Sequence, residues 1–243
     1  MEILIYLLLG ISSFFFVVVP VSGSFVLNPL LVLITDPHSA ISIAAFFFLL
    51  NSTIKASIFR KDIQYEYVKK ILPISLLAAG VGAFAVGLIP DQILLILIFV
   101  LSLYFLLKTV KTIISKKEKE KKSNNLVTHT MSLFSGFMQG AGVGSGGSLR
   151  KMFLLSENLT LPQMHGTTSF ISVVLLALSV GIRLATEQVA VKTLLPIVYL
   201  IPIMILATWL GRNFLKRMNK KTTRIVTVVV MVILTVVLGT KIF

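Results

Sequence analysis

The uncharged stretch ILIYLLLGISSFFFVVVPVSGSFVLNPLLVLIT, residues 3–35, decides the fold class of this chain. As one helix the stretch would be about 50 Å long, whereas the hydrocarbon core of a bilayer is about 30 Å thick. A single straight crossing would therefore leave part of the stretch outside the hydrocarbon core. Its middle contains residues that break helices or form local hydrogen bonds, namely Pro20, Ser22, Gly23, Ser24, Asn28 and Pro29. We expect a broken hairpin of two short helices in this stretch.

The composition of the whole chain requires lipid as a solvent. Of 243 residues, 56% are hydrophobic and 13% are charged, whereas a soluble domain is roughly half apolar and a quarter charged. Apolar stretches long enough to cross a bilayer occur repeatedly, which excludes a signal peptide or a single anchor. The composition therefore predicts an all-α integral membrane protein with several crossings, in contact with membrane lipid.

The charge balance is strongly basic, with 23 Lys and Arg against 9 Asp and Glu and a formal net charge of +14. In a soluble protein this balance would suggest nucleic acid as a partner. Here the basic residues lie mostly between apolar segments, as the positive-inside rule describes for cytoplasmic loops, so we expect no nucleic-acid binding. Cysteine is absent, which excludes disulfides and thiolate metal sites.

The chain divides into two halves of the same plan. Each half contains three further apolar spans, at residues 39–59, 71–88 and 92–107 and again at 166–184, 193–210 and 225–240. Residues 108–122, with seven Lys and two Glu, have the composition of a solvated linker. Each half begins with an interrupted apolar run. This run is residues 3–35 in the first half and the glycine-interrupted residues 126–155 in the second half. We predict a first membrane repeat at 1–114, a basic linker at 115–125 and a second repeat at 126–243.

The two halves are predicted to have opposite topology. A shift of 123 residues pairs Gly23 with Gly146 and Pro73 with Pro196, and such internal symmetry is typical of transporter folds. The basic segments 60–70, 108–122 and 212–224 should be cytoplasmic. Each half then contains one broken or re-entrant hairpin plus three transmembrane helices, an odd number of traversals. We therefore expect inverted repeats in the cytoplasmic membrane, with both termini outside and the central linker inside.

The most informative motif is GAGVGSGGSLRK, residues 140–151, which has five glycines among its first eight residues. Each glycine costs about 1 kcal/mol in a helix relative to Ala, and unwound backbone at membrane depth needs a protein or water cover. The backbone N–H groups and the start of the next helix could form an anion cradle. The candidate cradle residues are Gly142, Gly144, Ser145, Gly146, Gly147 and Ser148, with Arg150 and Lys151 adding positive charge. The alternative is that the glycines only permit close helix packing.

The ionisable residues within or near the apolar spans are all basic, namely Lys55, Arg150, Lys151, His165 and Arg183. Intramembrane charges usually face a pathway, so this set indicates an anionic substrate and argues against a carboxylate-lined cation antiporter. The alternative for the long side chains is that they extend to an interface. His165 precedes a hydroxyl-rich predicted helix start containing Thr168, which could bind an oxyanion or serve only as a cap. Ser22, Gly23, Asn28 and Asn51 are candidates for a neutral side of the same site, or for polar contacts between helices.

The sequence resembles the TauE/SafE family of sulfite and organosulfonate exporters over essentially its whole length. The resemblance is carried by Gly136-Phe137-Met138-Gln139-Gly140, by Gly142, Gly144, Gly146 and Gly147, and by Pro162, Gly166-Thr167-Thr168-Ser169, Pro196 and Gly211. Family members usually have a third consecutive glycine where Ser145 or Ser148 stands here. The resemblance implies transport of sulfur-containing or other small organic anions across the cytoplasmic membrane, coupled to a proton or sodium gradient.

The expected function is a secondary transporter that holds a small anion between its two broken hairpins and exposes it to either side in turn. An anion channel of the same architecture is the alternative. No phosphate-binding GxxxxGK[ST] motif occurs. We expect no enzyme activity, cofactor or metal, because His38, His129 and His165 form no metal-spaced or catalytic motif with the carboxylates.

Overall fold

The computed structural model describes residues 24–114, 125–142, 146–157 and 159–215, together with Leu9, Val232 and Gly239. Every regular element in these ranges is a helix, which confirms the predicted all-α class. Four helical segments are long and apolar enough to cross a membrane, at Pro37–Ile58, Tyr65–Gly87, Leu161–Ala185 and Val191–Leu210. Most of the expected span at 225–240, most of the expected linker at 115–125 and most of the first broken run lie outside the described residues. The last residue of the expected linker, Asn125, is the first residue of helix α6.

The first half contains five described elements: α2 (Ser24–Val32), α3 (Pro37–Ile58), the 3-10 helix η1 (Arg60–Asp62), α4 (Tyr65–Gly87) and α5 (Asp91–Ile114). Asp36 caps α3 by accepting a hydrogen bond from the Ser39 N–H at 2.8 Å. The prediction that Asn28 and Pro29 interrupt a helix is wrong, because both lie within α2. The chain instead turns between α2 and α3.

The second half contains α6 (Asn125–Ala141), α7 (Gly146–Ser156), α8 (Leu161–Ala185), α9 (Val191–Leu194), η2 (Leu195–Leu200) and α10 (Ile201–Leu215). Thr160 and Gln163 form a capping box at the start of α8. The predicted helix start at His165 and Thr168 is therefore wrong, since these residues lie inside α8. Pro196 is near the start of η2, where its missing N–H is tolerated.

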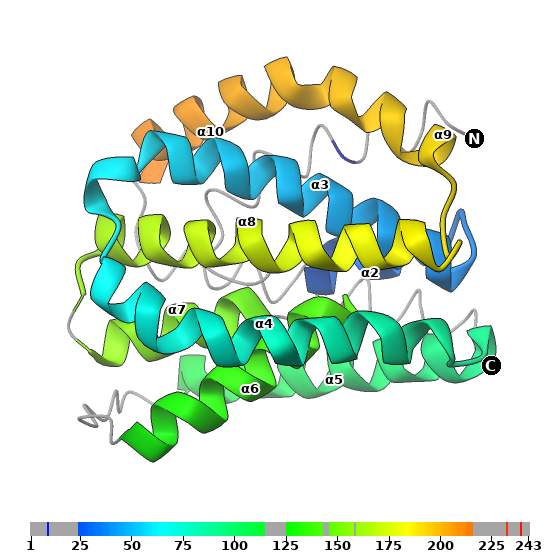
Figure 1. Ribbon diagram of the computed structural model, residues 1–243, viewed down its shortest axis with the longest axis horizontal. Helices are drawn as coiled ribbons and strands as arrows, with labels where there is room; N and C mark the ends of the chain where they lie inside the picture. Colours follow the sequence, from blue (N-terminus) through cyan, green and yellow to red (C-terminus); the bar gives the residue numbers. More distant parts are fainter. Residues whose placement is uncertain are drawn as a thin grey trace.

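Helix α8 lies between α3 and α4 and packs against both, while α4 packs most extensively against α6 (Figure 1). The major contacts therefore join helices of the two predicted halves. Small residues make the α4–α6 contact close, because a Cβ atom added at Gly136 or Gly140 would overlap the backbone of Ser75 or Ala79. Such small-residue contacts are the usual basis of helix association in membranes.

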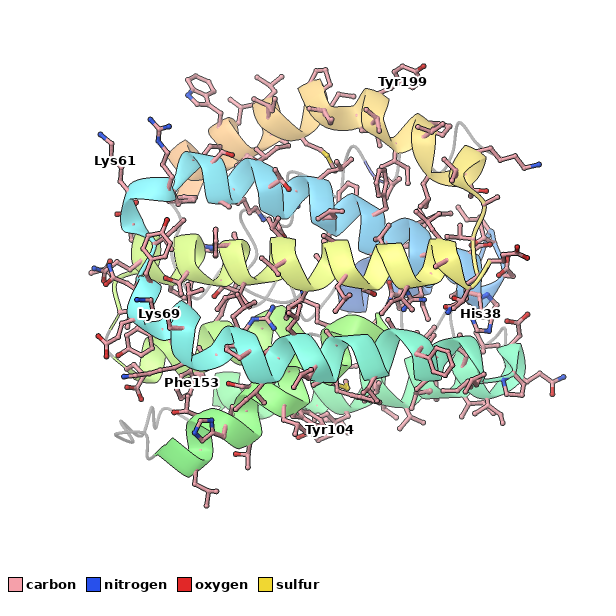
Figure 2. The ribbon with its side chains drawn as sticks, viewed as in Figure 1. His38, Lys61, Lys69, Tyr104, Phe153 and Tyr199 are labelled. Atoms are coloured by element: carbon pink, nitrogen blue, oxygen red, sulfur yellow. The ribbon has the colours of Figure 1, made fainter. Side chains whose placement is uncertain are left out.

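The molecule has two chemically different ends, which Figure 2 places at opposite ends of its long axis. The basic end carries Lys61 and Lys69 together with the end of α3 and the start of α8, where the rings of Phe59 and His165 stack with centroids 5.8 Å apart. At the acidic end, His38 Nε2 lies 3.0 Å from the Ile89 carbonyl oxygen and 3.5 Å from Asp91 Oδ1. Helices α3 and α8 consequently run in opposite directions.

Candidate functional site

The glycine-rich motif joins α6 to α7, which contact each other closely. Gly142 follows α6 with a φ of 72°, a left-handed conformation that suits glycine, and a Cβ atom there would overlap the Ile41 side chain. A Cβ atom at Gly146 would overlap the Ser135 carbonyl oxygen. These two glycines are therefore required for backbone conformation and packing, as the alternative interpretation of the motif proposed. Gly144 and Ser145 lie outside the described residues.

Gly147 differs from its neighbours in the motif. Among the described residues, only Ser172 Oγ lies within 4 Å of a Cβ atom built at Gly147, at 3.9 Å. This separation is an ordinary van der Waals contact. Gly147 is also half-buried, whereas Gly146 is buried. Close helix packing does not explain the glycine at this position.

Asn28 of α2 contacts the end of α6 directly. Its Nδ2 donates a hydrogen bond of 2.6 Å to the carbonyl oxygen of Gly142, and the side chain is buried. The structure thus brings together two predicted site residues, Asn28 from the first broken run and Gly142 from the second. The remaining first-run candidates, Ser22 and Gly23, lie outside the described residues.

Arg150 lies inside the helix assembly with 2% of its surface exposed. Its Nη2 donates to Gln139 Oε1 of α6 and, at 2.9 Å, to Ser172 Oγ of α8. Both acceptors are neutral, and Nε and Nη1 have no partner among the described residues. Arg150 therefore links α6, α7 and α8 and does not extend its head group to an interface.

The charge of Arg150 has no carboxylate partner in the described part of the chain. The ion pairs found there join His38 to Asp91 and Lys70 to Glu66, and neither includes Arg150. Removing an ion from water costs several kcal/mol even after protein relaxation. A buried cation without a protein counter-ion is therefore a strong indication of an anionic ligand.

Lys55, Lys151 and His165 form a second group, here called the basic cluster. All three are half-buried, and they lie close enough for the charges of the two lysines to act on each other and on the imidazole of His165. Lys151 also interacts electrostatically with Arg150. His165 stacks on Phe59 at the basic end, and Lys151 is next to Arg150 in α7, so the basic cluster lies between that end and Arg150.

Arg183 has a structural role that the sequence interpretation did not foresee. It is fully buried, and its Nη2 donates to the carbonyl oxygens of Gly140 at 3.0 Å and Ala141 at 2.8 Å. These are among the last carbonyls of α6, which have no intrahelical partner. The interpretation that Arg183 extends to an interface is wrong for this reason. A helix that ends inside the protein needs a donor for its last carbonyl oxygens. This requirement is the reasoning by which the role of Arg183 could have been predicted from the sequence.

Several neutral candidates are buried without a hydrogen-bond partner for one side-chain atom within the described ranges. These atoms are Asn28 Oδ1 of α2, Asn51 Oδ1 of α3, Ser148 Oγ of α7 and Thr168 Oγ1 of α8. Ser172 and Gln139, which bind Arg150, were not among the predicted site residues. The signal for Ser172 was a polar stripe on α8, because Thr168, Ser172, Ser179 and Arg183 recur at helical spacing.

Comparison with known proteins assigns the chain to a family. No curated protein and no solved structure gave a match. A family model described as sulfite exporter TauE/SafE matches residues 5–238, nearly the whole chain. A match of this extent covers both halves, the glycine-rich motif and every described helix. The chain is therefore a member of the TauE/SafE family of membrane permeases, which are transporters of sulfite and related anions.

Proposed function

We propose that this chain is a secondary transporter that carries a small anion across the cytoplasmic membrane by alternating access. The substrate class is sulfite, an organosulfonate or a related sulfur-containing or organic anion. The observation that carries the proposal is the buried guanidinium of Arg150, which contacts only neutral acceptors and keeps Nε and Nη1 unpartnered in the described part of the chain.

The unused donors of Arg150 suit an oxyanion. A guanidinium has five N–H donors, and three of them belong to Nε and Nη1. Charge-assisted hydrogen bonds to an anion are roughly twice as strong as neutral ones. An anion bound at this point would both satisfy the donors and neutralise the buried charge. Ser148 Oγ, which is buried without a partner among the described residues, offers one further hydroxyl on the same helix.

The basic cluster supports a route from the basic end to Arg150. Positive groups on α3, α7 and α8 raise the local concentration of anions at that end. Away from the basic end, Ile41 and Arg183 lie close to Gly142 and Asn28 binds its carbonyl oxygen. This distribution supports a state in which the anion reaches the site from the basic end.

The architecture supports an inverted repeat as the basis of alternating access. Helices α3 and α8 run in opposite directions and pack on each other, and each begins with a side-chain cap and a proline in its first turn. Pro73 in α4 corresponds to Pro196 in η2. Two halves related in this way can exchange conformations and expose a central site to either side. The positive-inside rule then assigns the basic end and the central linker to the cytoplasm, and both termini to the outside.

The first test is transport of sulfite and organosulfonates by purified protein in lipid vesicles, comparing wild type with Arg150→Gln. Loss of a hydrogen bond to a charged group costs about 1.5–3 kcal/mol, so we expect transport to fall at least about tenfold. Lys61→Gln is the matched control, because Lys61 is exposed at the basic end, and it should transport normally. Equal transport by wild type and Arg150→Gln would contradict the proposed site.

Counterflow distinguishes a carrier from the anion channel that shares this architecture. Vesicles preloaded with unlabelled substrate should accelerate uptake of labelled substrate, and uptake should saturate. Repeating the assay with an imposed proton gradient and then a sodium gradient identifies the coupling ion. Uptake that is linear in substrate concentration and shows no counterflow would overturn the carrier mechanism in favour of a channel.

A further inference from the structure

Gly147 is the one glycine of the described α6–α7 region that packing and backbone conformation leave unexplained. A Cβ atom added at Gly136, Gly140 or Gly146 would overlap the backbone of a neighbouring helix. Gly142 has a left-handed backbone. At Gly147 an added Cβ atom would have only Ser172 Oγ within 4 Å among the described residues. No helix in the described part of the chain therefore fills the space beside Gly147.

This space lies next to Arg150. Ser172 Oγ, 3.9 Å from the Cβ position of Gly147, accepts a hydrogen bond of 2.9 Å from Arg150 Nη2. Gly147 is in the first turn of the eleven-residue helix α7, where backbone N–H groups have no intrahelical partner. The unpartnered Nε and Nη1 of the buried Arg150 are a second, independent indication of a ligand at this helix start.

We propose that Gly147 sets the size limit of the transported anion, because the substituent attached to the anionic group occupies the volume that a side chain would fill. This inference rests on the proposed transport function and adds a specificity-determining residue to it. The oxyanion binds Arg150, while the organic part of the substrate lies against the Cα atom of Gly147 and Ser172. A glycine here admits sulfonates that carry a carbon substituent.

The geometry predicts a graded response to side chains at this position. The Cβ atom of Ala meets Ser172 Oγ at an ordinary contact distance, and Ala favours a helix over Gly. Gly147→Ala should consequently fold as well as wild type. Val adds two more methyl groups and should fill the remaining space. One methylene in a substrate pocket changes discrimination by about 10–200-fold, so each step should exclude a smaller substituent.

The test measures transport of sulfite, methanesulfonate, ethanesulfonate and taurine by wild type, Gly147→Ala and Gly147→Val in vesicles. We expect Gly147→Ala to lower the transport of ethanesulfonate and taurine relative to that of sulfite at least about tenfold. Gly147→Val should also reject methanesulfonate. The matched control is Gly181→Ala on α8, where an added Cβ atom has nothing within 4 Å among the described residues, and its size profile should equal that of wild type.

Each other outcome has a defined meaning. Equal loss of all four anions in Gly147→Ala, an unchanged profile, or a profile shared with Gly181→Ala would overturn the size limit. A melting temperature of Gly147→Ala clearly below that of wild type would also overturn it, because the space would then be occupied by protein. If wild type transported only sulfite, the site would accept no carbon substituent, and the inference would be wrong. Transport of none of the anions by wild type would instead contradict the proposed function itself.

Discussion

At the scale of single residues, two buried arginines of this chain have different roles. Arg183 donates to the carbonyl oxygens that end α6, whereas Arg150 binds only Gln139 and Ser172 and keeps unpartnered donors in the described structure. If Arg183 were replaced, the Gly140 carbonyl oxygen would keep its hydrogen bond from Ser179 Oγ, whereas that of Ala141 would lose its charged donor, and a buried unsatisfied group costs about 1–3 kcal/mol. Replacing an uncompensated buried charge with an apolar side chain is often neutral or stabilising.

The matched substitutions Arg183→Met and Arg150→Met should therefore change stability in different ways. We expect Arg183→Met to destabilise the protein by about 1–3 kcal/mol, and Arg150→Met to change stability by less than about 1 kcal/mol or to raise it. Thermal unfolding in detergent without added anion measures both. Sulfite should raise the melting temperature of wild type but not that of Arg150→Met. Comparable destabilisation by both substitutions would show that Arg150 is also structural.

At the scale of elements, the α4–α6 contact explains why part of the glycine motif exists. Gly140 approaches the backbone of Ala79, while Gly181 on the exposed face of α8 meets no described atom. Gly140→Ala should consequently destabilise the protein by about 1–3 kcal/mol through overpacking. Gly181→Ala should be neutral or stabilising by up to about 1 kcal/mol, because Ala is the better helix former. Thermal unfolding of the two variants provides the comparison, and equal stability would contradict the close α4–α6 approach.

Hydropathy located the helices but not all of their boundaries or contacts. The spans at 39–59 and 166–184 correspond to α3 and α8 because apolar length alone specifies a crossing. The start of α8 was misplaced because the capping box at Thr160 precedes the apolar residues. The helical position of Asn28 depends on tertiary contact, since its side chain binds Gly142 more than a hundred residues away. The pairing of Arg150 with Ser172 likewise requires the packing of α7 on α8, which no local pattern contains.

At the scale of the whole molecule, the separation of basic and acidic ends determines how the protein is expected to lie in the membrane. Lys61 follows α3 at the basic end, and Lys192 begins the segment after α8 at the other end. Both lysines are exposed. From the positive-inside rule we expect the denser group of basic residues around Lys61 to face the cytoplasm. We then expect Lys192, close to the end of α8, to face the outside.

Because the chain contains no cysteine, Lys61→Cys and Lys192→Cys each introduce a single reactive thiol, and the same substitution is made at both ends. In intact cells a membrane-impermeant maleimide should label Lys192→Cys and leave Lys61→Cys unlabelled. After permeabilisation both should react, which controls for thiol accessibility. The reverse labelling would invert the orientation and place the basic cluster at the outer entrance. Labelling of both variants in intact cells would contradict the assignment of the two ends to opposite faces of the membrane. It would also contradict the odd number of traversals in each half, on which the inverted repeat depends.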